Sequence, residues 1–209
     1  MTPRLAVLIS GAGTTLQNFI DRIADGSLPA RVAVVISSRR DAYGLERART
    51  AGIPTAVVAR KEFGNEEQFN DALHHELDRH AFDLIVLAGF LSLFQLRGRF
   101  TGRVLNVHPA LIPAFCGKGF YGERVHRAVL ESGVKVSGCT IHFADERYDH
   151  GPIILQGTVP VLDDDTPETL AARVHVLENQ LYPEAIRLWS EGRLKVEGRR
   201  VRILEPFGG

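Results

Sequence analysis

The chain has 209 residues, 44% of them hydrophobic, which is enough to bury one substantial core, so a single domain is expected. Lys plus Arg and Asp plus Glu both number 25, and this balance argues against the broad positive field that drives binding to nucleic acid. The two cysteines, Cys116 and Cys139, lack the spacing of a metal-binding pair and are too few for a disulfide scaffold, which favours a reducing, cytoplasmic location.

The first half of the chain alternates apolar segments with amphipathic ones. Short runs rich in β-branched residues predict strands buried on both faces, at residues 5–10, 32–37, 55–58, 83–88 and 104–107. The first of these runs is too short for a signal peptide or a membrane span. Helical spacing predicts helices at 14–24, 42–51 and 66–79, and a weaker, short helix at 93–100. This alternation predicts an α/β fold with a mostly parallel, doubly wound sheet.

The pattern changes after Pro109. A glycine-containing loop at 113–122 leads into a predicted helix at 123–130. Two longer predicted strands, 134–143 and 152–159, flank a polar segment that is typical of a functional loop and not of a tight hairpin turn. An Asp-rich start predicts a long helix at 166–189, and the tail at 193–203 has the pattern of an edge hairpin, so the C-terminal strands should be partly antiparallel.

The loop after the first strand has the composition of a phosphate site. Ser10 to Thr15 joins that strand to the first helix, so its backbone N–H groups can converge on an anion at the helix N-terminus. Gly11 and Gly13 allow a tight turn, and the hydroxyl groups of Thr14 and Thr15 suit a terminal phosphate monoester. A turn that needs glycines for structural reasons alone is the other interpretation.

A dinucleotide site is a rival for the same loop. The dinucleotide pattern requires a third small residue where Leu16 stands, and an NAD site requires an acidic residue at the end of the second strand. That strand ends instead in Ser37-Ser38-Arg39-Arg40, and the two arginines suit the extra phosphate of NADP. An NADP-dependent reductase is therefore the alternative enzyme class.

Two polar side chains end the fifth predicted strand. Asn106 and His108 are separated by one residue, so both project to the same side, at the edge where a doubly wound sheet binds ligands. A carboxamide can stabilise a developing oxyanion, and a histidine can transfer a proton near neutral pH. A hydrogen-bonded corner with no catalytic role is the other interpretation. Asp149, in the polar loop, is either a solvated turn residue or, if it reaches His108, a carboxylate that raises the pKa of that histidine.

The other histidines lack the spacing of a zinc site, and no metal cofactor is expected. They are His74, His75, His80, His126, His142, His150 and His175. The expected partners are small-molecule substrates, with neither nucleic acid nor membrane, for a chain that is a monomer or a homodimer.

Several segments resemble the folate-dependent formyltransferase family. The segment from Gly138 to Ile153, Gly-Cys-Thr-Ile-His-Phe-Ala-Asp-Glu-Arg-Tyr-Asp-His-Gly-Pro-Ile, is similar to the family signature, which runs from a glycine through a small hydroxyl residue to the catalytic aspartate and a following glycine. The segment from Asn106 to Pro113 is similar to the family's other hallmark. Further similarity, at Ser10–Gln17, Gly44–Ala48 and Leu87–Phe90, extends the resemblance over nearly the whole chain.

The resemblance implies a Rossmann-like formyltransferase fold with helices on both faces of the sheet. It also implies transfer of the formyl group of 10-formyltetrahydrofolate, as co-substrate, to the primary amine of glycinamide ribonucleotide in purine biosynthesis. Asn106 and a protonated His108 would polarise the formyl oxygen and stabilise the tetrahedral intermediate, while Asp149 would raise the pKa of His108 and relay protons. Residues 1–209 would form one domain, with nucleotide binding up to about residue 105 and catalysis and folate binding in the remainder.

The same resemblance assigns binding residues. The ribonucleotide would be held by Gly11, Gly13, Thr14, Thr15 and Glu178. The folate would be held, largely through backbone groups, by Leu91, Ser92, Leu93, Phe94, Asn106, Asp145, Glu146, Arg147, Tyr148 and Asp149. Glu66 stands where several relatives have an arginine that contacts the folate.

Three other functions compete with this one. Formyltetrahydrofolate hydrolase shares the Asn, His and Asp arrangement but normally carries a regulatory domain before it, and here the first predicted strand begins at Leu5. The related transferase that acts on methionyl-tRNA carries an added tRNA-binding domain, which the charge balance disfavours. A non-enzymatic phosphosugar-binding module would leave the combination of Asn106, His108 and Asp149 without a purpose.

Overall fold

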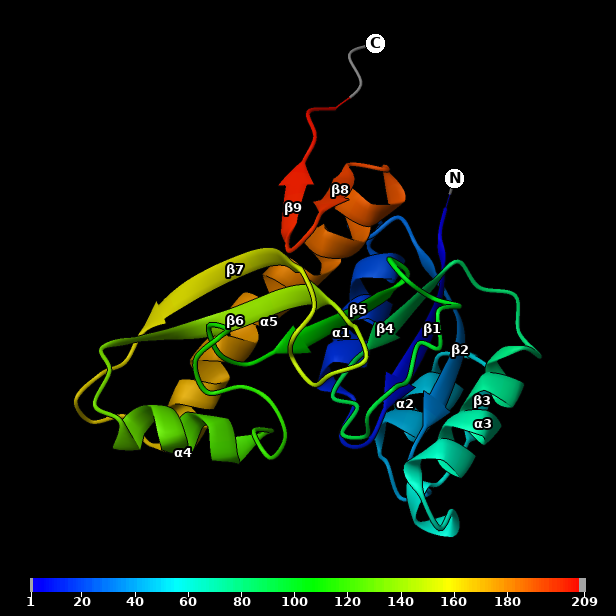
Figure 1. The fold of residues 1–209 in the computed structure, drawn as a ribbon, viewed down its shortest axis with the longest axis horizontal. Helices are drawn as coiled ribbons and strands as arrows, with labels where there is room; N and C mark the ends of the chain where they lie inside the picture. The colour runs from blue at the N-terminus through cyan, green and yellow to red at the C-terminus, as the bar shows by residue number, and fades with distance from the viewer. Residues whose placement is uncertain (1, 207–209) are drawn as a thin grey trace. The chain divides into compact units, whose positions relative to one another are not determined.

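The computed structural model describes residues 2–206, which fall into two compact units separated between Leu105 and Asn106 (Figure 1). Each unit is built on β-strands covered by helices. The functional roles predicted for residues 1–105 and 106–209 do not follow from this division and stay predictions.

The first unit alternates strands and helices. In chain order it contains β1 (Arg4–Ile9), α1 (Thr14–Ala24), β2 (Arg31–Ser37), α2 (Gly44–Thr50), β3 (Thr55–Val57), the 3-10 helix η1 (Arg60–Glu62), α3 (Glu66–Leu77) and β4 (Leu84–Leu87). The strands lie in the order β3-β2-β1-β4 and pair in parallel. Right-handed crossovers place α1 and α2, which contact each other, on one face, and the return from β3 to β4 places α3 on the other.

The strand β1 is buried on both faces. Every residue from Leu5 to Ile9 is 0% exposed, which explains why this strand reads as a continuous apolar run and not as an alternating one. Full burial of one aliphatic side chain stabilises a fold by about 1.5–3 kcal/mol. The strand therefore holds the start of the following loop, at Ser10, firmly in place.

The segment 93–100 is not helical, and the prediction of a helix there was wrong. The side chains of α3 bind its backbone instead. Asn70 donates from Nδ2 to the carbonyl of Leu93 at 3.2 Å and accepts at Oδ1 from the N–H of Gln95 at 2.8 Å, while the ring of His74 lies 2.7 Å from the Gln95 carbonyl. These long-range bonds replace the local bonds of a helix. The helical spacing of apolar residues thus reflected the burial of the segment and not its backbone conformation.

The second unit carries the antiparallel strands. It contains β5 (Val104–His108, whose first two residues belong to the first unit), α4 (Glu123–Glu131), β6 (Val136–Phe143), β7 (Ile153–Pro160), α5 (Pro167–Ser190), β8 (Leu194–Glu197) and β9 (Arg200–Ile203). The strands lie in the order β5-β6-β7-β9-β8. The pairs β6–β7 and β8–β9 are antiparallel, while β9 joins β7 in parallel. The prediction of a mostly parallel sheet with partly antiparallel C-terminal strands is confirmed.

The core of the second unit lies where α5 packs on β6 and β7 and α4 packs against α5. Its buried members are Val129, Cys139, Val159, Leu170 and Val174. Burial raises the pKa of the Cys139 thiol to about 12, so this cysteine stays protonated and behaves as a small apolar residue.

The strands β6 and β7 leave no room for a side chain at one glycine. A Cβ added to Gly138 would lie 1.9 Å from the carbonyl oxygen of Gly157. That oxygen belongs to the backbone, so it cannot rotate away as a side chain could. The position tolerates only glycine unless the two strands separate.

Gly138→Ala is therefore expected to lower the free energy of unfolding by about 3 kcal/mol through overpacking. Urea denaturation followed by circular dichroism measures this change. Gly64→Ala is the matched control, because a Cβ there would meet only the flexible end of Gln68, at 3.4 Å. Equal stability of the two variants would contradict the expectation.

Candidate active site

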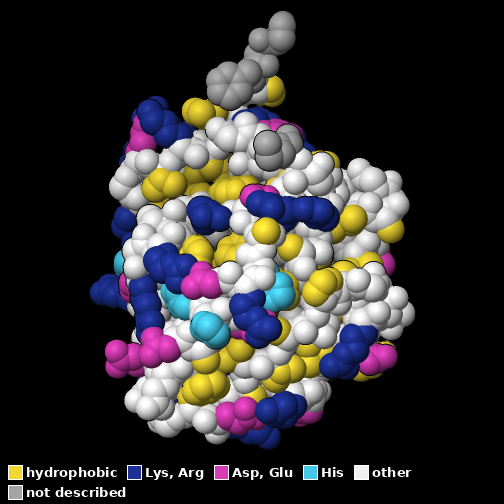
Figure 2. Space-filling view, turned by 90° about the vertical axis from the view of Figure 1, so that its right-hand side faces the viewer, with side chains coloured by type: hydrophobic (Ala, Val, Ile, Leu, Met, Phe, Trp, Pro, Cys, Tyr) yellow, Lys and Arg dark blue, Asp and Glu magenta, His cyan; other side chains and the backbone are white. Residues whose placement is uncertain are grey.

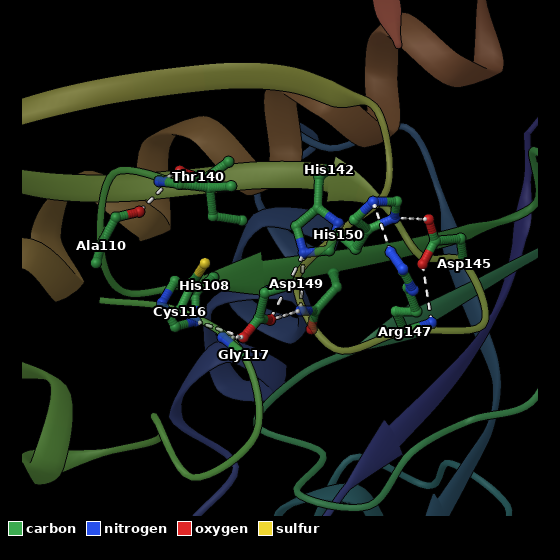
Figure 3. Close-up of polar contacts among 12 residues, drawn as sticks. His108, Ala110, Cys116, Gly117, Thr140, His142, Asp145, Arg147, Asp149 and His150 are labelled. Carbon is green, nitrogen blue, oxygen red and sulfur yellow. Dashed lines mark hydrogen bonds and ion pairs between the residues drawn. The ribbon is translucent and has the colours of Figure 1, made fainter. Parts of the chain in front are cut away.

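The three residues predicted to be catalytic meet around one buried carboxylate (Figure 3). Asn106 and His108 project from β5, and Asp149 lies in the loop between β6 and β7. Asp149 Oδ2 lies 3.3 Å from His108 Nδ1, and Asp149 Oδ1 accepts a hydrogen bond of 3.3 Å from Asn106 Nδ2. The side chains of His108 and Asp149 are only 3% and 9% exposed, so solvent screens their interaction little. The structure thus joins the carboxylate to the two β5 residues.

His108 has an acceptor at each ring nitrogen. Nε2 lies 2.8 Å from the carbonyl oxygen of Phe115, and Nδ1 faces Asp149. A ring that donates from both nitrogens is the charged form, so these contacts favour protonation. Burial opposes protonation and has the larger effect, so the pKa of His108 lies below its ordinary value of 6.5. Asp149 does raise this pKa, as the sequence predicted, but burial outweighs it.

Asp149 is held by several donors. Burial raises its pKa, but the neighbouring His142 and His108 side chains and the N–H of Gly117 together outweigh burial and bring the pKa below the ordinary value of 3.8. The Gly117 N–H donates to Oδ2 at 2.9 Å. The backbone of Asp149 has a φ of 51°, a left-handed conformation that costs about 1 kcal/mol outside glycine and persists where the surroundings hold it.

His142 is a site residue that the sequence analysis missed. It lies on β6, is 1% exposed, and its Nε2 is 3.1 Å from Asn106 Nδ2. Its Nδ1 lies 2.8 Å from the carbonyl of Phe143, so Nδ1 carries the hydrogen and Nε2 accepts from the Asn106 amide. The 3.8 Å from Nε2 to Asp149 Oδ1 is too long for a hydrogen bond. The signal was its position two residues after Thr140, on the same face of β6.

A buried hydroxyl group anchors the chain that follows His108. Thr140 Oγ1 donates to the carbonyl of Ala110 at 2.7 Å, as Figure 3 shows, and accepts from the N–H of Ile112 at 3.1 Å. The Gln156 amide donates to the same hydroxyl at 2.9 Å and to the Ile112 carbonyl at 3.0 Å. This network fixes the start of the loop whose backbone contacts both His108 and Asp149.

In the first unit, the predicted phosphate residues form the turn before α1. Gly13 is the N-cap of α1, with a φ of 70° and no side-chain hydrogen bond that caps the helix. Gly11 and Thr14 are exposed, whereas Thr15 is only 7% exposed. The N-terminal N–H groups and the helix dipole at this end favour an anion.

The helix α2 supports this turn from one side. The N–H of Gly44 donates to the carbonyl of Gly11 at 3.1 Å, and Arg47 Nε donates to the carbonyl of Ala12 at 2.9 Å. A Cβ added to Gly13 would lie 2.5 Å from the Cα of Gly44. The two glycines therefore allow the start of α2 to pack directly against the turn.

The predicted folate residues 91–94 follow β4. The N–H of Leu91 donates to Ser10 Oγ at 2.9 Å, so this segment lies beside the predicted phosphate loop. Leu91 is 47% exposed, and the next two residues are half-buried. The side chain of Phe94 is 2% exposed and stacks on the ring of His74, so it belongs to the core.

The other predicted folate residues form the loop between β6 and β7. The carboxylate of Asp145 accepts from the N–H of Arg147 at 2.9 Å and lies 2.6 Å from His150 Nδ1 (Figure 3). Glu146 is exposed and Tyr148 is half-buried. The contact between Asp145 and His150 closes the loop on itself.

Glu178, predicted to contact the ribonucleotide, lies on α5 and is 8% exposed. It accepts a hydrogen bond of 3.2 Å from His175 Nδ1, which raises the pKa of His175. Its charge also raises the pKa of His108, although burial has the larger effect there. Burial lowers the pKa of His126, and Glu178 opposes this shift. Among the described residues, Nδ1 of His126 has no hydrogen-bond partner.

Within residues 2–206, no group of three or more His, Cys, Asp and Glu side chains is arranged to hold a metal ion. No helix in the same range combines the length and the apolar character that crossing a membrane requires.

Comparisons with known proteins point to one group of enzymes. The formyl transferase family model matches residues 3–186. The phosphoribosylglycinamide formyltransferase of Haemophilus influenzae is 43% identical over 196 residues, which cover 93% of this chain and 90% of that protein. The crystal structure of glycinamide ribonucleotide transformylase 1 from Symbiobacterium toebii aligns with a TM-score of 0.91 at 50% identity, over 98% of this chain and 95% of that one. A formyltetrahydrofolate deformylase from Pseudomonas syringae aligns with a TM-score of 0.87 over 98% of this chain and 67% of that one, but its 23% identity shows the fold alone.

The opposing effects of burial and of Asp149 on the pKa of His108 can be measured directly. His108 is expected to titrate below 6.5, and Asp149→Asn should lower its pKa further, because the substitution removes the charge and leaves the burial. Because the pKa of His108 is lower in the folded protein than in the unfolded protein, the free energy of unfolding should decrease as the pH falls below about 6.5. NMR titration of the histidine ring protons gives the pKa. Asp71→Asn, on the surface of the first unit, is the control, and an unchanged His108 pKa in Asp149→Asn would contradict the coupling.

Proposed function

The chain belongs to the formyl transferase family, and on this premise we propose that it transfers the formyl group of 10-formyltetrahydrofolate to the primary amine of glycinamide ribonucleotide in purine biosynthesis. The observation that carries the proposal is the contact of Asp149 with both His108 and Asn106, at 3.3 Å each. The two relatives named for this activity cover nearly the full length of the chain and support the same pair of substrates. A cytoplasmic location, small-molecule partners and a chain that is a monomer or a homodimer are parts of the proposal.

His108 is suited to donate a hydrogen bond to the formyl oxygen. Its Nε2 lies 2.8 Å from a carbonyl oxygen, that of Phe115, so this nitrogen is oriented to interact with an oxygen of the same chemical type. When the amine attacks the formyl carbon, negative charge develops on the formyl oxygen, and a protonated His108 stabilises it. The burial that lowers the pKa of His108 also makes its protonated form a stronger acid.

Asp149 is suited to accept a proton. The attacking amine loses one proton as its new C–N bond forms, and N10 of tetrahydrofolate gains one as the old C–N bond breaks. The lowered pKa of Asp149 keeps the carboxylate ionised near neutral pH, so it can take up the first of these protons, directly or through water. The same charge favours protonation of His108.

Asn106 has acceptors for both hydrogens of its amide group. They are His142 Nε2 at 3.1 Å and Asp149 Oδ1 at 3.3 Å. Donation to a formyl oxygen therefore requires the release of one of these bonds, and we take it to be the bond to Asp149, which is the longer of the two. The bond to His142 then keeps the amide oriented during the reaction.

The residues predicted to bind the ribonucleotide carry groups that suit it. The N-terminus of α1 provides N–H groups for the phosphate, with Gly11, Gly13, Thr14 and Thr15 around it. Glu178 supplies a buried carboxylate for the ribose or the amine. The folate would bind to the exposed backbone of residues 91–94 and 145–149.

Two alternatives fit less well. The arginines that would bind the extra phosphate of NADP already face carboxylates, since Arg39 lies 2.7 Å from Asp41 and Arg40 lies 2.6 Å from Glu62. This pairing reduces the positive charge that the reductase requires. The hydrolase would use the same catalytic residues with water in place of the amine, so an assay has to separate it from the transferase.

The decisive assay follows 10-formyltetrahydrofolate with and without glycinamide ribonucleotide. A transferase consumes the folate only when the ribonucleotide is present, whereas release of free formate in its absence would identify a hydrolase. His108→Ala should lower turnover roughly 10²-fold or more, because it removes the donor to the developing oxyanion. Isothermal titration with the ribonucleotide should show nearly unchanged binding. Turnover near that of the wild type would refute the role of His108.

Gly13→Ala should raise KM for the ribonucleotide with a smaller effect on KM for the folate. The added Cβ would clash with Gly44 and distort the phosphate turn, at a position that also has a left-handed backbone. Gly26→Ala is the matched control, because Gly26 also has a positive φ but has nothing within 4 Å of an added Cβ. An effect confined to the folate would contradict the placement of the phosphate.

A further inference from the structure

The turn between β8 and β9 reaches the loop that carries Asp149. Arg199, in that turn, donates from Nη2 to the carbonyl of His150 at 2.9 Å, and its Nη1 lies 3.0 Å from His150 Nε2. The hairpin is held at this point because β9 pairs with β7 where Arg200 meets Ile153. Nothing in the proposed reaction otherwise uses this hairpin.

The arginine contacts define the hydrogen-bonding state of His150. A guanidinium group only donates, so Nε2 of His150 must accept from Arg199 and, at 3.4 Å, from Arg147. The ring hydrogen is then on Nδ1, which donates to Asp145 Oδ2 at 2.6 Å (Figure 3). On the face that Figure 2 shows, histidine side chains lie beside Lys and Arg side chains. His150 therefore ties the start of the loop, Asp145, to the hairpin.

Asp149 immediately precedes the residue that Arg199 binds. Its φ of 51° is a conformation that the chain adopts only where its surroundings maintain it. The carbonyl bound by Arg199 is that of His150, one peptide unit beyond the one that follows the Asp149 Cα, so this bond limits displacement of the backbone just after Asp149. Such a rotation would move the carboxylate away from Nδ1 of His108, which lies 3.3 Å from it.

We propose that Arg199 is a positioning residue for the reaction: through His150, it holds Asp149 in the orientation that contacts His108. The inference rests on the proposed catalytic role of Asp149. It gives the C-terminal hairpin a function, namely to brace the loop between β6 and β7. It also predicts that a substitution outside the site changes the chemical step without changing the binding of the ribonucleotide.

The test is steady-state kinetics of Arg199→Met across pH. The value of kcat should fall roughly tenfold, because a small displacement of a catalytic group is enough for such a loss, while KM for the ribonucleotide stays nearly unchanged. If protonated His108 is the active form, activity is lost as the pH rises through its pKa. A weaker contact with Asp149 lowers that pKa, so the basic limb of the profile should move to lower pH. Arg199→Lys retains one donor and should recover part of kcat.

Two controls separate positioning from general damage to the hairpin. Arg202→Met removes an exposed arginine of the same hairpin, paired with Glu197 at 2.7 Å, and should leave kcat and the pH profile unchanged. The double variant His150→Ala/Arg199→Met should have a kcat only slightly below that of the more severe single variant, because both residues act by holding Asp149 in place. A fall in melting temperature large enough to account for the lost activity would overturn the inference, as would independent, multiplicative effects of the two substitutions.

Asp149→Asn in the same assay distinguishes this inference from its premise. If Asp149→Asn is inactive while Arg199→Met behaves as the wild type, only the positioning role of Arg199 is overturned. If Asp149→Asn retains full activity, the proposed role of Asp149 fails, and the inference about Arg199 fails with it.

Discussion

The buried carboxylate of Asp149 is the interaction on which the rest of the candidate site depends. An ionised carboxylate that is 9% exposed has lost most of its hydration, and it stays charged only if protein donors replace the lost water. The donors come from β5, through Asn106 and His108, and from the loop that follows β5, through the N–H of Gly117. Each donor must be delivered by a segment that is itself fixed. The strand β5, the hydrogen bonds of Thr140 and the contacts of His150 with Arg199 all meet this requirement.

His108 illustrates how the same burial acts in two directions. Removal from water strengthens the attraction between its ring and Asp149, but it also penalises the charged ring itself. The second effect is larger, and the pKa is lowered. A histidine in this position holds its proton less tightly than one in water, and it gives the proton up more readily to a developing oxyanion. The negative charge of Asp149 raises the pKa of His108 and so makes the ring release its proton less readily.

The parts of the fold that were predictable from sequence are those where local pattern and tertiary environment agree. The strand β1 is apolar from Leu5 to Ile9 because it is buried on both faces, and Gly13, directly before α1, has a positive φ that favours glycine. The segment 93–100 was mispredicted because its apolar residues pack against α3, while distant side chains such as Asn70 bind its backbone. The contact of Asp149 with His108 depends on a loop that closes over 41 residues of chain, from 108 to 149, and residue spacing alone carries no sign of it. His142 was missed for a related reason. The sequence does not show whether a buried histidine on an apolar strand faces the core or the polar groups of the site.

The loop at residues 113–122 supplies hydrogen-bond partners of the same type as the substrates would. The carbonyl of Phe115 faces His108 Nε2, and the N–H of Gly117 binds Asp149. A substrate that takes over these positions exchanges one hydrogen bond for another, so the groups that we propose to be catalytic add little to affinity. Affinity must then come from the remote parts of the two substrates, the phosphate at one end and the pterin at the other. Small formyl donors and simple amines that lack these parts would therefore find the catalytic groups already satisfied, which protects the formyl group from unintended acceptors.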